Sequence, residues 1–369
     1  MLLHLTLIAT SAYLPIERNI SVIYYIIPYL IWLIFCIWKA SHFRQELHPL
    51  DYLFALPLIL IPVLRAEDVG LDTGNYIDYA QSIIWWNGQR TIDMEFGYVL
   101  LMRFVAVFTS DPRLVVALIS LLAAILFFFM LYMWENGQCI VSLILIPLCF
   151  FSYTINILRV GIAFPLAAIA ILQLEKKRYA PFYILAIASI SIQMTAAILL
   201  PMLWLARGGA KVSLKWALYG LIPGALILYL GYYIFGDLIA YKLLGYFIAP
   251  SPENITGSGY LLFSFLCSII AIWFSEKGHR YLGLIFLVIQ AAFFGFAQLT
   301  LVAHRLQDIA LFAQLLALSY CAKRPINRGH LAVVLLLCCL AFSLVARNFS
   351  GIGGVPSGFI PYHFFWESQ

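Results

Sequence analysis

The chain has 369 residues, of which 64% are hydrophobic and only 11% are charged, and its mean hydropathy is +0.95. Soluble domains carry about a quarter charged residues, so this composition excludes a protein whose whole surface faces water. The formal net charge of +5 is small for this length, and we assign it to basic loops that set membrane topology, with no nucleic-acid partner.

Continuous apolar runs predict membrane-spanning helices. Backbone groups in lipid must be satisfied within the protein, which leaves helices or a closed barrel. Barrel strands alternate apolar and polar residues, whereas a run such as VVALISLLAAILFFFMLYM does not. We therefore predict an all-α polytopic membrane protein with roughly thirteen transmembrane helices in a single integral membrane domain, residues 1–369. The main expected spans lie near 2–15, 20–38, 50–64, 112–134, 138–154, 157–174, 214–235, 259–275, 281–300, 305–321 and 331–347.

Basic clusters mark the cytoplasmic side of a membrane protein. With every such cluster inside, residues 65–97, 236–258 and 348–369 fall outside. This topology requires that 97–110 does not cross, and we expect a re-entrant or interfacial helix there because the segment is short and carries Arg103. The clusters are KASHFR (39–44), EKKR (175–178), RGGAKVSLK (207–215), EKGHR (276–280) and KRPINR (323–328).

A pair of short helices is predicted between two of these clusters. Only about 28 residues separate Arg178 from Arg207, against roughly 20 for one full span, so the chain must leave and return within the membrane. The turn falls near residues 191–195 and carries Gln193. Irregular backbone at this depth is tolerated only where it lines protein or water, so the turn is a candidate site.

The outer loop 65–97 concentrates six of the seventeen acids of the chain. Its stretch DTGNYIDYAQSIIWW predicts an amphipathic helix that Asp72 or Thr73 caps and that lies on the membrane surface. A solvated, acid-rich loop is the alternative interpretation. Aromatic rings beside carboxylates also suit sugars, because ring faces stack on pyranose C–H surfaces while polar groups bind hydroxyls. The acids are Glu67, Asp68, Asp72, Asp78, Asp93 and Glu95, and the aromatic residues at helical spacing are Tyr76, Tyr79 and Trp86.

Ionisable residues at the outer ends of other spans are candidate functional residues, because charge within a membrane is costly. Arg159 opens one helix, His304 and Arg305 lie in another, and Arg347 ends the last span. Each arginine could instead extend to the membrane surface, and Asp308 could pair with Arg305. Arginine binds phosphate oxygens as a fork, so arginines that share one face suit a lipid-linked pyrophosphate.

Short motifs follow the spans in a defined order. They are RAEDVGLDTGNY with Arg65, Gly70, Asp72 and Tyr76; EFGYVLL with Glu95, Gly97 and Tyr98; RVGIA with Arg159; a polar residue between two short helices; a helix with Arg305; and a C-terminal PY pair. Over about residues 50–365 this pattern resembles the EpsG-like polysaccharide polymerases, relatives of the Wzy O-antigen polymerases. One departure is Gln193, because family members often carry His there and Gln cannot exchange a proton near neutral pH.

The resemblance implies a GT-C-like, inverting glycosyltransferase at the outer face of the bacterial cytoplasmic (inner) membrane. It would transfer a growing glycan from undecaprenyl pyrophosphate to the non-reducing sugar of a new lipid-linked repeat unit. We expect no cofactor and no metal, since the sequence has neither a D-x-D nor an H-E-x-x-H motif. The expected partners are the lipid-linked oligosaccharide as donor and acceptor, membrane lipid and, as a further candidate, a chain-length regulator protein.

Two demands of this reaction assign roles to residues. Cations must face the leaving pyrophosphate, and a carboxylate must accept the proton of the attacking hydroxyl. The predicted base is Asp72 or Glu95, and the sequence does not choose between them. The predicted pyrophosphate ligands are Arg159 and Arg305, then Arg65 and Arg347, and the predicted sugar ligands are Tyr76, Tyr98, Gln193 and His304.

Other functions remain open at this point. A lipid flippase or transporter is expected to have two matching halves, and the sequence has no such symmetry. An O-antigen ligase would use the same donor with a different acceptor. A membrane acyltransferase would need a His–Asp pair at a lipid-thioester site, which the sequence does not indicate.

Overall fold

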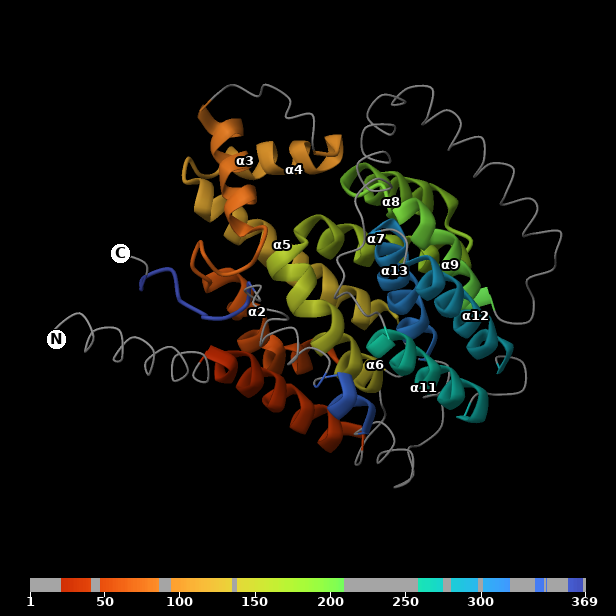
Figure 1. Ribbon diagram of the computed structural model, residues 1–369. Coiled ribbons are helices and arrows are strands. Elements are labelled where there is room, and N and C mark those ends of the chain that lie inside the picture. Colours follow the sequence, from red (N-terminus) through yellow and green to blue (C-terminus); the bar gives the residue numbers. More distant parts are fainter. Residues whose placement is uncertain are drawn as a thin grey trace. The chain divides into compact units, whose positions relative to one another are not determined.

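The computed structural model describes residues 21–40, 47–85, 94–134, 138–208, 258–274, 280–297, 301–318, 336–341, 343 and 358–367 (Figure 1). All regular elements in these ranges are helices, apart from one isolated bridge between Arg65 and Phe364. Three of these helices are long and apolar enough to cross a membrane, in agreement with the predicted polytopic helical protein. They are Ser21–Ala40, Pro112–Met133 and Leu158–Glu175.

The helices coincide with most of the expected spans. The expected spans near 2–15 and 214–235 lie outside the described residues, as does the expected loop up to residue 257, and the expected span near 331–347 is described only at 336–341 and 343. The total of roughly thirteen spans and the GT-C-like architecture stay predictions.

In chain order the labelled elements are the 3₁₀ helix η1 (Pro49–Ala55), α2 (Leu56–Leu64), α3 (Thr73–Trp85), α4 (Phe96–Ala106), α5 (Pro112–Met133), α6 (Gln138–Leu145), the π-helices η2 (Ile146–Phe150) and η3 (Ser152–Asn156), α7 (Leu158–Glu175), α8 (Tyr179–Ile192), α9 (Ala196–Gly208), α11 (Ser258–Phe274), α12 (Arg280–Ala297) and α13 (Leu301–Ala317).

The chain divides into two compact units, Met1–Ala196 with Pro325–Gln369, and Ala197–Arg324. In the second unit α11, α12 and α13 pack against one another. Hydrogen bonds between buried polar residues join α11 to α13, since Gln314 Nε2 donates to Ser268 Oγ at 2.8 Å. Such bonds hold helices together where lipid supplies no hydrophobic driving force. The single integral membrane domain stays a prediction.

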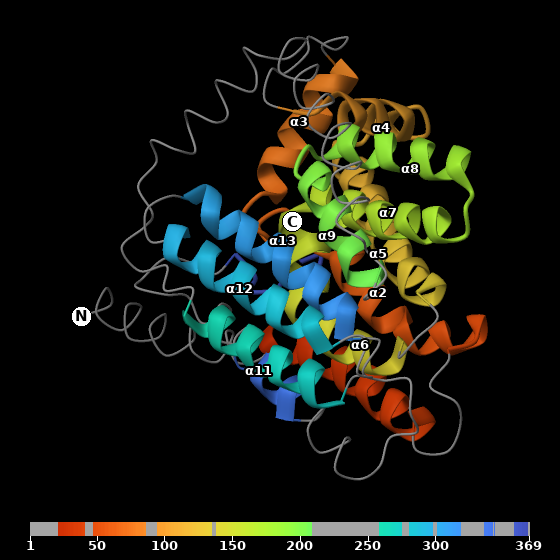
Figure 2. The ribbon, with the colours of Figure 1, turned by 90° about the vertical axis from the view of Figure 1, so that its right-hand side faces the viewer.

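Helix α5 is the centre of the first unit. Asp111 caps it by accepting a hydrogen bond from the Arg113 N–H at 2.9 Å, and Pro112 is its first residue. Its 22 residues extend about 33 Å, enough to cross the hydrocarbon core of a bilayer. Helices α2, α3, α4 and α7 all pack against it. Both views show α3 and α4 at one end of this unit and the helix Ser21–Ala40 at the other (Figures 1 and 2).

Hydrogen bonds and an ion pair connect segments of the first unit that the predicted topology places on the cytoplasmic side. The Leu47 N–H donates to Gln138 Oε1 at 2.6 Å, and Gln138 Nε2 donates to the Tyr132 carbonyl at 2.7 Å. Lys39, at the end of the first long helix, forms an ion pair with Asp51. These segments therefore lie together, and their assignment to the cytoplasmic side stays a prediction.

Two π-helical segments lead into the sharp turn before α7. Helices η2 and η3 continue α6 as far as Ile157, whose φ of −116° and ψ of 63° end the helix. Helix α7 begins at the next residue. A Cβ atom at Gly161 would lie 2.9 Å from the Tyr153 carbonyl carbon, so glycine is needed for this approach. The first turn of α7, with Arg159, consequently packs on the backbone of η3.

The predicted short helices are present. Helix α8 has 14 residues and ends at Ile192, Gln193 is extended with φ −148° and ψ 113°, and α9 begins at Ala196. A helix of this length extends about 20 Å, which is less than the bilayer core. Helix α4, with 11 residues, is also too short to cross, as expected for 97–110. Entry of the pair into the membrane stays a prediction.

Arg65 connects four segments at the end of the first unit that carries α3 and α4. The residue is buried at 5% exposure. Its guanidinium reaches the end of α2, the start of α3, the side of α5 and the backbone of η3. The acceptors are the Pro62 carbonyl, Thr73 Oγ1 at 3.2 Å, Ser120 Oγ at 2.9 Å, the Thr154 carbonyl at 3.3 Å and the Ile155 carbonyl at 3.2 Å.

We expect Arg65→Ala to lower the thermal unfolding temperature of the purified protein strongly. The variant leaves several buried acceptors without a donor, and each such group costs roughly 1–3 kcal/mol. Arg65→Lys should rescue only part of the loss, because one ammonium cannot reach all these segments. The control is Arg178→Ala, which removes an exposed arginine. Equal melting of Arg65→Ala and Arg178→Ala would contradict the structural role.

Candidate active site

The loop that follows α2 is held by the C-terminal segment. The Ala66 N–H donates to the His363 carbonyl at 2.8 Å. The Tyr362 hydroxyl donates to the Ile61 carbonyl at 2.9 Å. The PY pair, Pro361 and Tyr362, therefore belongs to the framework that positions the acid-rich loop.

The loop turns into α3 at Gly70. Its φ of +103° is unfavourable for residues with a side chain, and a Cβ atom would lie 2.9 Å from Ile155 Cγ2. The Leu71 N–H then donates to Asn156 Oδ1 at 3.0 Å. These two contacts hold the start of α3 against the end of η3, immediately before α7.

Helix α3 brings a carboxylate and a phenol to this point. The Asp72 carbonyl accepts a hydrogen bond from the Tyr76 N–H at 3.0 Å, which gives Asp72 the predicted N-cap position. Asp72 is half-exposed, whereas Tyr76 is buried. Burial raises the pKa of Tyr76 and the Arg159 guanidinium opposes this shift. Tyr76 is consequently a neutral hydrogen-bonding group at physiological pH.

Arg159 and Glu95 form a partly buried ion pair. Arg159 Nη1 donates to Glu95 Oε2 at 2.5 Å, and the two side chains are 25% and 8% exposed. Tyr76 is a second hydrogen-bonding neighbour of Arg159. Arg159 Nε is buried and has no hydrogen-bond partner within the described part of the chain. The guanidinium is therefore anchored on one side and keeps a donor for another group.

Tyr98 lies beside this pair. It is fully buried, and its ring centroid is 5.7 Å from that of Tyr76. Its hydroxyl has no hydrogen-bond partner among the residues described. Buried polar groups are normally paired, so an unpaired phenol next to an incompletely paired arginine indicates a binding site.

The predicted turn at Gln193 lies near the same cluster. A Cβ atom at Gly97 would lie 2.7 Å from the Ser191 carbonyl carbon, so the start of α4 packs directly on the end of α8. Ser189 Oγ also donates to the Ala163 carbonyl at 2.7 Å, which sets the end of α8 beside the first turns of α7. Gln193 follows at once, and its Oε1 is buried without a partner in the described ranges.

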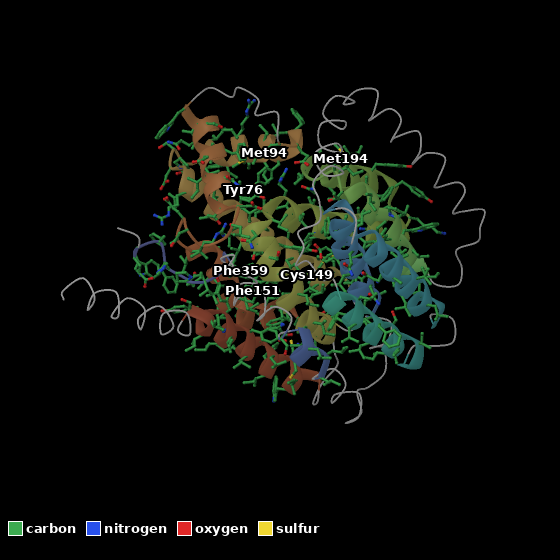
Figure 3. The ribbon with its side chains drawn as sticks, in the orientation of Figure 1. Tyr76, Met94, Cys149, Phe151, Met194 and Phe359 are labelled. Carbon is green, nitrogen blue, oxygen red and sulfur yellow. The ribbon has the colours of Figure 1, made fainter. Side chains whose placement is uncertain are left out.

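Side chains before and after these residues occupy the same region. Figure 3 shows Tyr76 on α3, Met94 directly before Glu95, and Met194 directly after Gln193 in the upper part of the view. Met94 is buried and Met194 is half-buried. Segments far apart in the sequence thus supply apolar as well as polar groups at this end of the first unit.

The structure brings together some of the predicted site residues. Arg65 is close by, but its donors are occupied by protein acceptors. His304 and Arg305 lie on α13 in the second unit, and their relation to the cluster stays a prediction. Arg347 lies outside the described residues. The clustered residues are Asp72, Tyr76, Glu95, Tyr98 and Arg159, with Gln193 adjoining.

Sequence reasoning missed two residues that build this site. Asn156 holds the Leu71 N–H, and Ser120 accepts a hydrogen bond from Arg65. Each is a polar residue within an apolar run, which is the only signal that could have indicated it.

No group of three or more His, Cys, Asp or Glu side chains suited to a metal ion is present among the described residues. The expectation of a metal-independent reaction stays a prediction.

Comparison with known proteins gives one match. The sequence model of the EpsG family covers residues 48–364, which includes every residue of the cluster described above. No curated protein and no solved structure matches the chain. The long helix Ser21–Ala40 precedes the matched region.

We expect Gly97→Ala to destabilise the first unit and to disturb the Glu95–Arg159 pair. The added methyl group must push α4 away from α8, and overpacking of this kind costs about 1–3 kcal/mol. The measurement is thermal unfolding of the purified protein. Gly74→Ala is the matched control, because a Cβ atom there meets nothing within 4 Å. A Gly97→Ala protein as stable as the control would contradict the close contact.

Proposed function

The chain belongs to the EpsG family, and on that premise we propose that it polymerises undecaprenyl-pyrophosphate-linked oligosaccharide repeat units at the outer face of the bacterial cytoplasmic membrane. Family membership and the apolar helices make it a membrane protein of the polysaccharide-polymerase type. The observation that carries the finer proposal is the Arg159 guanidinium, which contacts Glu95 and Tyr76 and keeps its Nε donor unpaired within the described ranges.

The proposed reaction is a single displacement at an anomeric carbon. A hydroxyl of the terminal sugar on a new lipid-linked unit attacks C1 of the growing glycan. One C–O bond forms while the bond from C1 to the pyrophosphate oxygen breaks, and the bonding electrons leave with undecaprenyl pyrophosphate. The hydroxyl proton passes to a carboxylate. Attack from the face opposite the leaving group inverts the configuration at C1.

Arg159 is the proposed ligand of the leaving pyrophosphate. Negative charge increases on that group in the transition state, and a preorganised cation lowers the barrier. The position of Arg159 at the second residue of α7 adds the positive end of a helix dipole. Arg305 stays a proposed second ligand and Arg347 a third. For Arg65 we propose a structural role in place of pyrophosphate binding, because its donors already contact protein acceptors.

Asp72 is the proposed general base. A base must reach the proton that it removes. Asp72 is half-exposed at the start of α3, and its charge acts on Tyr76. Glu95 is buried and already paired with Arg159. This difference favours Asp72 and leaves Glu95 a positioning role toward the arginine.

Tyr76, Tyr98 and Gln193 are the proposed sugar ligands of the first unit. The hydroxyl of Tyr98 and Oε1 of Gln193 lack partners among the described residues, so a bound glycan would satisfy them. Glutamine accepts and donates hydrogen bonds but does not transfer protons, which assigns Gln193 to orientation of the substrate. His304 stays a proposed sugar ligand on α13.

We expect the purified protein to convert one defined lipid-linked repeat unit into a ladder of longer products, and Arg159→Ala to lose this activity. Removing a single transition-state donor costs on the order of 100- to 1000-fold in rate. The measurement is electrophoresis of the products after incubation in lipid nanodiscs, with Arg178→Ala as the control. A flippase or a ligase would make no ladder from a single substrate, and that result would refute the polymerase proposal.

We expect Asp72→Asn to lower kcat by about 100-fold or more, since general base catalysis commonly contributes that much. The KM for the lipid-linked substrate should change little, because the carboxylate accepts the hydroxyl proton during the chemical step and does not act on substrate binding. The control is Asp78→Asn, an exposed acid on the same helix. A normal kcat for Asp72→Asn would exclude Asp72 as the base and return that role to Glu95.

A further inference from the structure

Glu95 occupies the guanidinium that the proposed function requires for the pyrophosphate. Its carboxylate contacts Arg159 Nη1 at 2.5 Å and is 8% exposed. A diphosphate and a glutamate are both oxyanions that bind the same N–H donors. They therefore compete for Arg159, and the ligand can use its full charge only after Glu95 withdraws.

The pair is poorly arranged for a purely structural role. Removing two charges from water is costly, and the cost is repaid only when all their hydrogen-bonding groups find partners. Here Arg159 Nε has none within the described residues, and the neighbouring Tyr98 hydroxyl has none either. Arg65 gives the contrast within the same unit, because each of its three guanidinium nitrogens donates to at least one protein acceptor. The Glu95–Arg159 pair thus leaves donors that an incoming anion would satisfy.

The carboxylate of Glu95 also has a second favourable position, at the start of α4. It is the N-cap residue of α4, where its carbonyl accepts the N–H groups of Tyr98 and Val99 at 3.1 Å each. Its side chain makes no cap hydrogen bond there. The first N–H groups of a helix and its dipole favour a nearby carboxylate. Rotation of the side chain alone can therefore carry the carboxylate from Arg159 toward the start of α4.

We propose that Glu95 is a resident counter-ion which a lipid diphosphate displaces from Arg159 on binding, and which returns to Arg159 when undecaprenyl pyrophosphate leaves. This inference rests on the proposed function, in which Arg159 binds the pyrophosphate. Glu95 acts through Arg159 and is a positioning residue. Its presence weakens the binding of every anion at Arg159, which limits inhibition by the released lipid and favours repeated turnover.

The test measures binding directly, with the full chain in lipid nanodiscs. The probe is radiolabelled undecaprenyl pyrophosphate, and undecaprenol, which lacks the charge, is the control ligand. We expect Glu95→Gln to lower the Kd for undecaprenyl pyrophosphate by about tenfold or more, because the competing charge is gone. Undecaprenol should bind both proteins equally. Glu67→Gln is the matched control variant, since it removes an acid of the same loop that is 58% exposed and lies 3.9 Å from Arg113.

A kinetic measurement separates this role from the alternatives. In the polymerisation assay, inhibition by added undecaprenyl pyrophosphate should become stronger in Glu95→Gln by the same factor as the Kd. If the Kd of Glu95→Gln for undecaprenyl pyrophosphate is unchanged or higher than that of the wild type, the proposal is overturned. This holds whether kcat is retained or is lost, as loss of a general base would predict. If Glu95→Gln unfolds, Glu95→Asp should show a smaller tightening, and an unchanged Kd in that variant overturns the proposal equally.

The same measurements distinguish failure of the counter-ion role alone from failure of the proposed polymerase function. A wild-type protein that makes a ladder and binds undecaprenyl pyrophosphate, but whose Glu95→Gln variant binds no tighter, disproves only the counter-ion role. A wild-type protein that binds no undecaprenyl pyrophosphate and makes no ladder disproves the polymerase proposal, and the counter-ion role falls with it.

Discussion

A buried guanidinium must find an acceptor for its N–H groups, and Arg65 finds them on four segments that are distant in the sequence. The end of α2, the start of α3, α5 and the backbone of η3 all contact this one side chain. The loop that carries Asp72 therefore cannot shift without breaking several hydrogen bonds at once. Everything proposed for Arg159 depends on this, because η3 leads directly into α7 and sets where the first turn of that helix lies.

Two arginines at the same end of the first unit thus differ in how many of their donors have protein acceptors. Each guanidinium nitrogen of Arg65 has a protein acceptor, whereas Arg159 has one carboxylate, one phenol and an unpaired Nε among the described residues. From sequence alone both were arginines at the outer ends of apolar runs, and both were expected to bind pyrophosphate. What separates them is the number of protein acceptors within reach, and these come from residues about 55 and 90 positions further along the chain. The sequence next to each arginine does not indicate which distant residues will supply its acceptors.

Hydropathy predicted much of the fold because the bilayer imposes a length on each apolar run. The helices Ser21–Ala40, α5 and α7 lie where the runs do, and the break after α8 lies where the spacing of the basic clusters required it. The helix beginning at Thr73 followed from its caps and aromatic spacing. Other features depend on packing between distant residues and left no pattern. The π-helical segments before Ile157, the hydrogen bond from Leu71 to Asn156 and the pairing of Ala66 with His363 are of this kind.

An enzyme that polymerises must release one lipid pyrophosphate for every unit that it adds. Interactions that bind substrate, transition state and product equally well do not speed the chemical step, and a strongly retained product slows the next cycle. An arginine with no counter-ion would bind the leaving group and the departed product alike. If Glu95 is the displaceable counter-ion proposed above, breaking its contact with Arg159 costs the same free energy for every anion that binds there. That cost lowers the affinity for the released lipid together with the affinity for the donor, so the released lipid leaves more readily as Glu95 returns to Arg159.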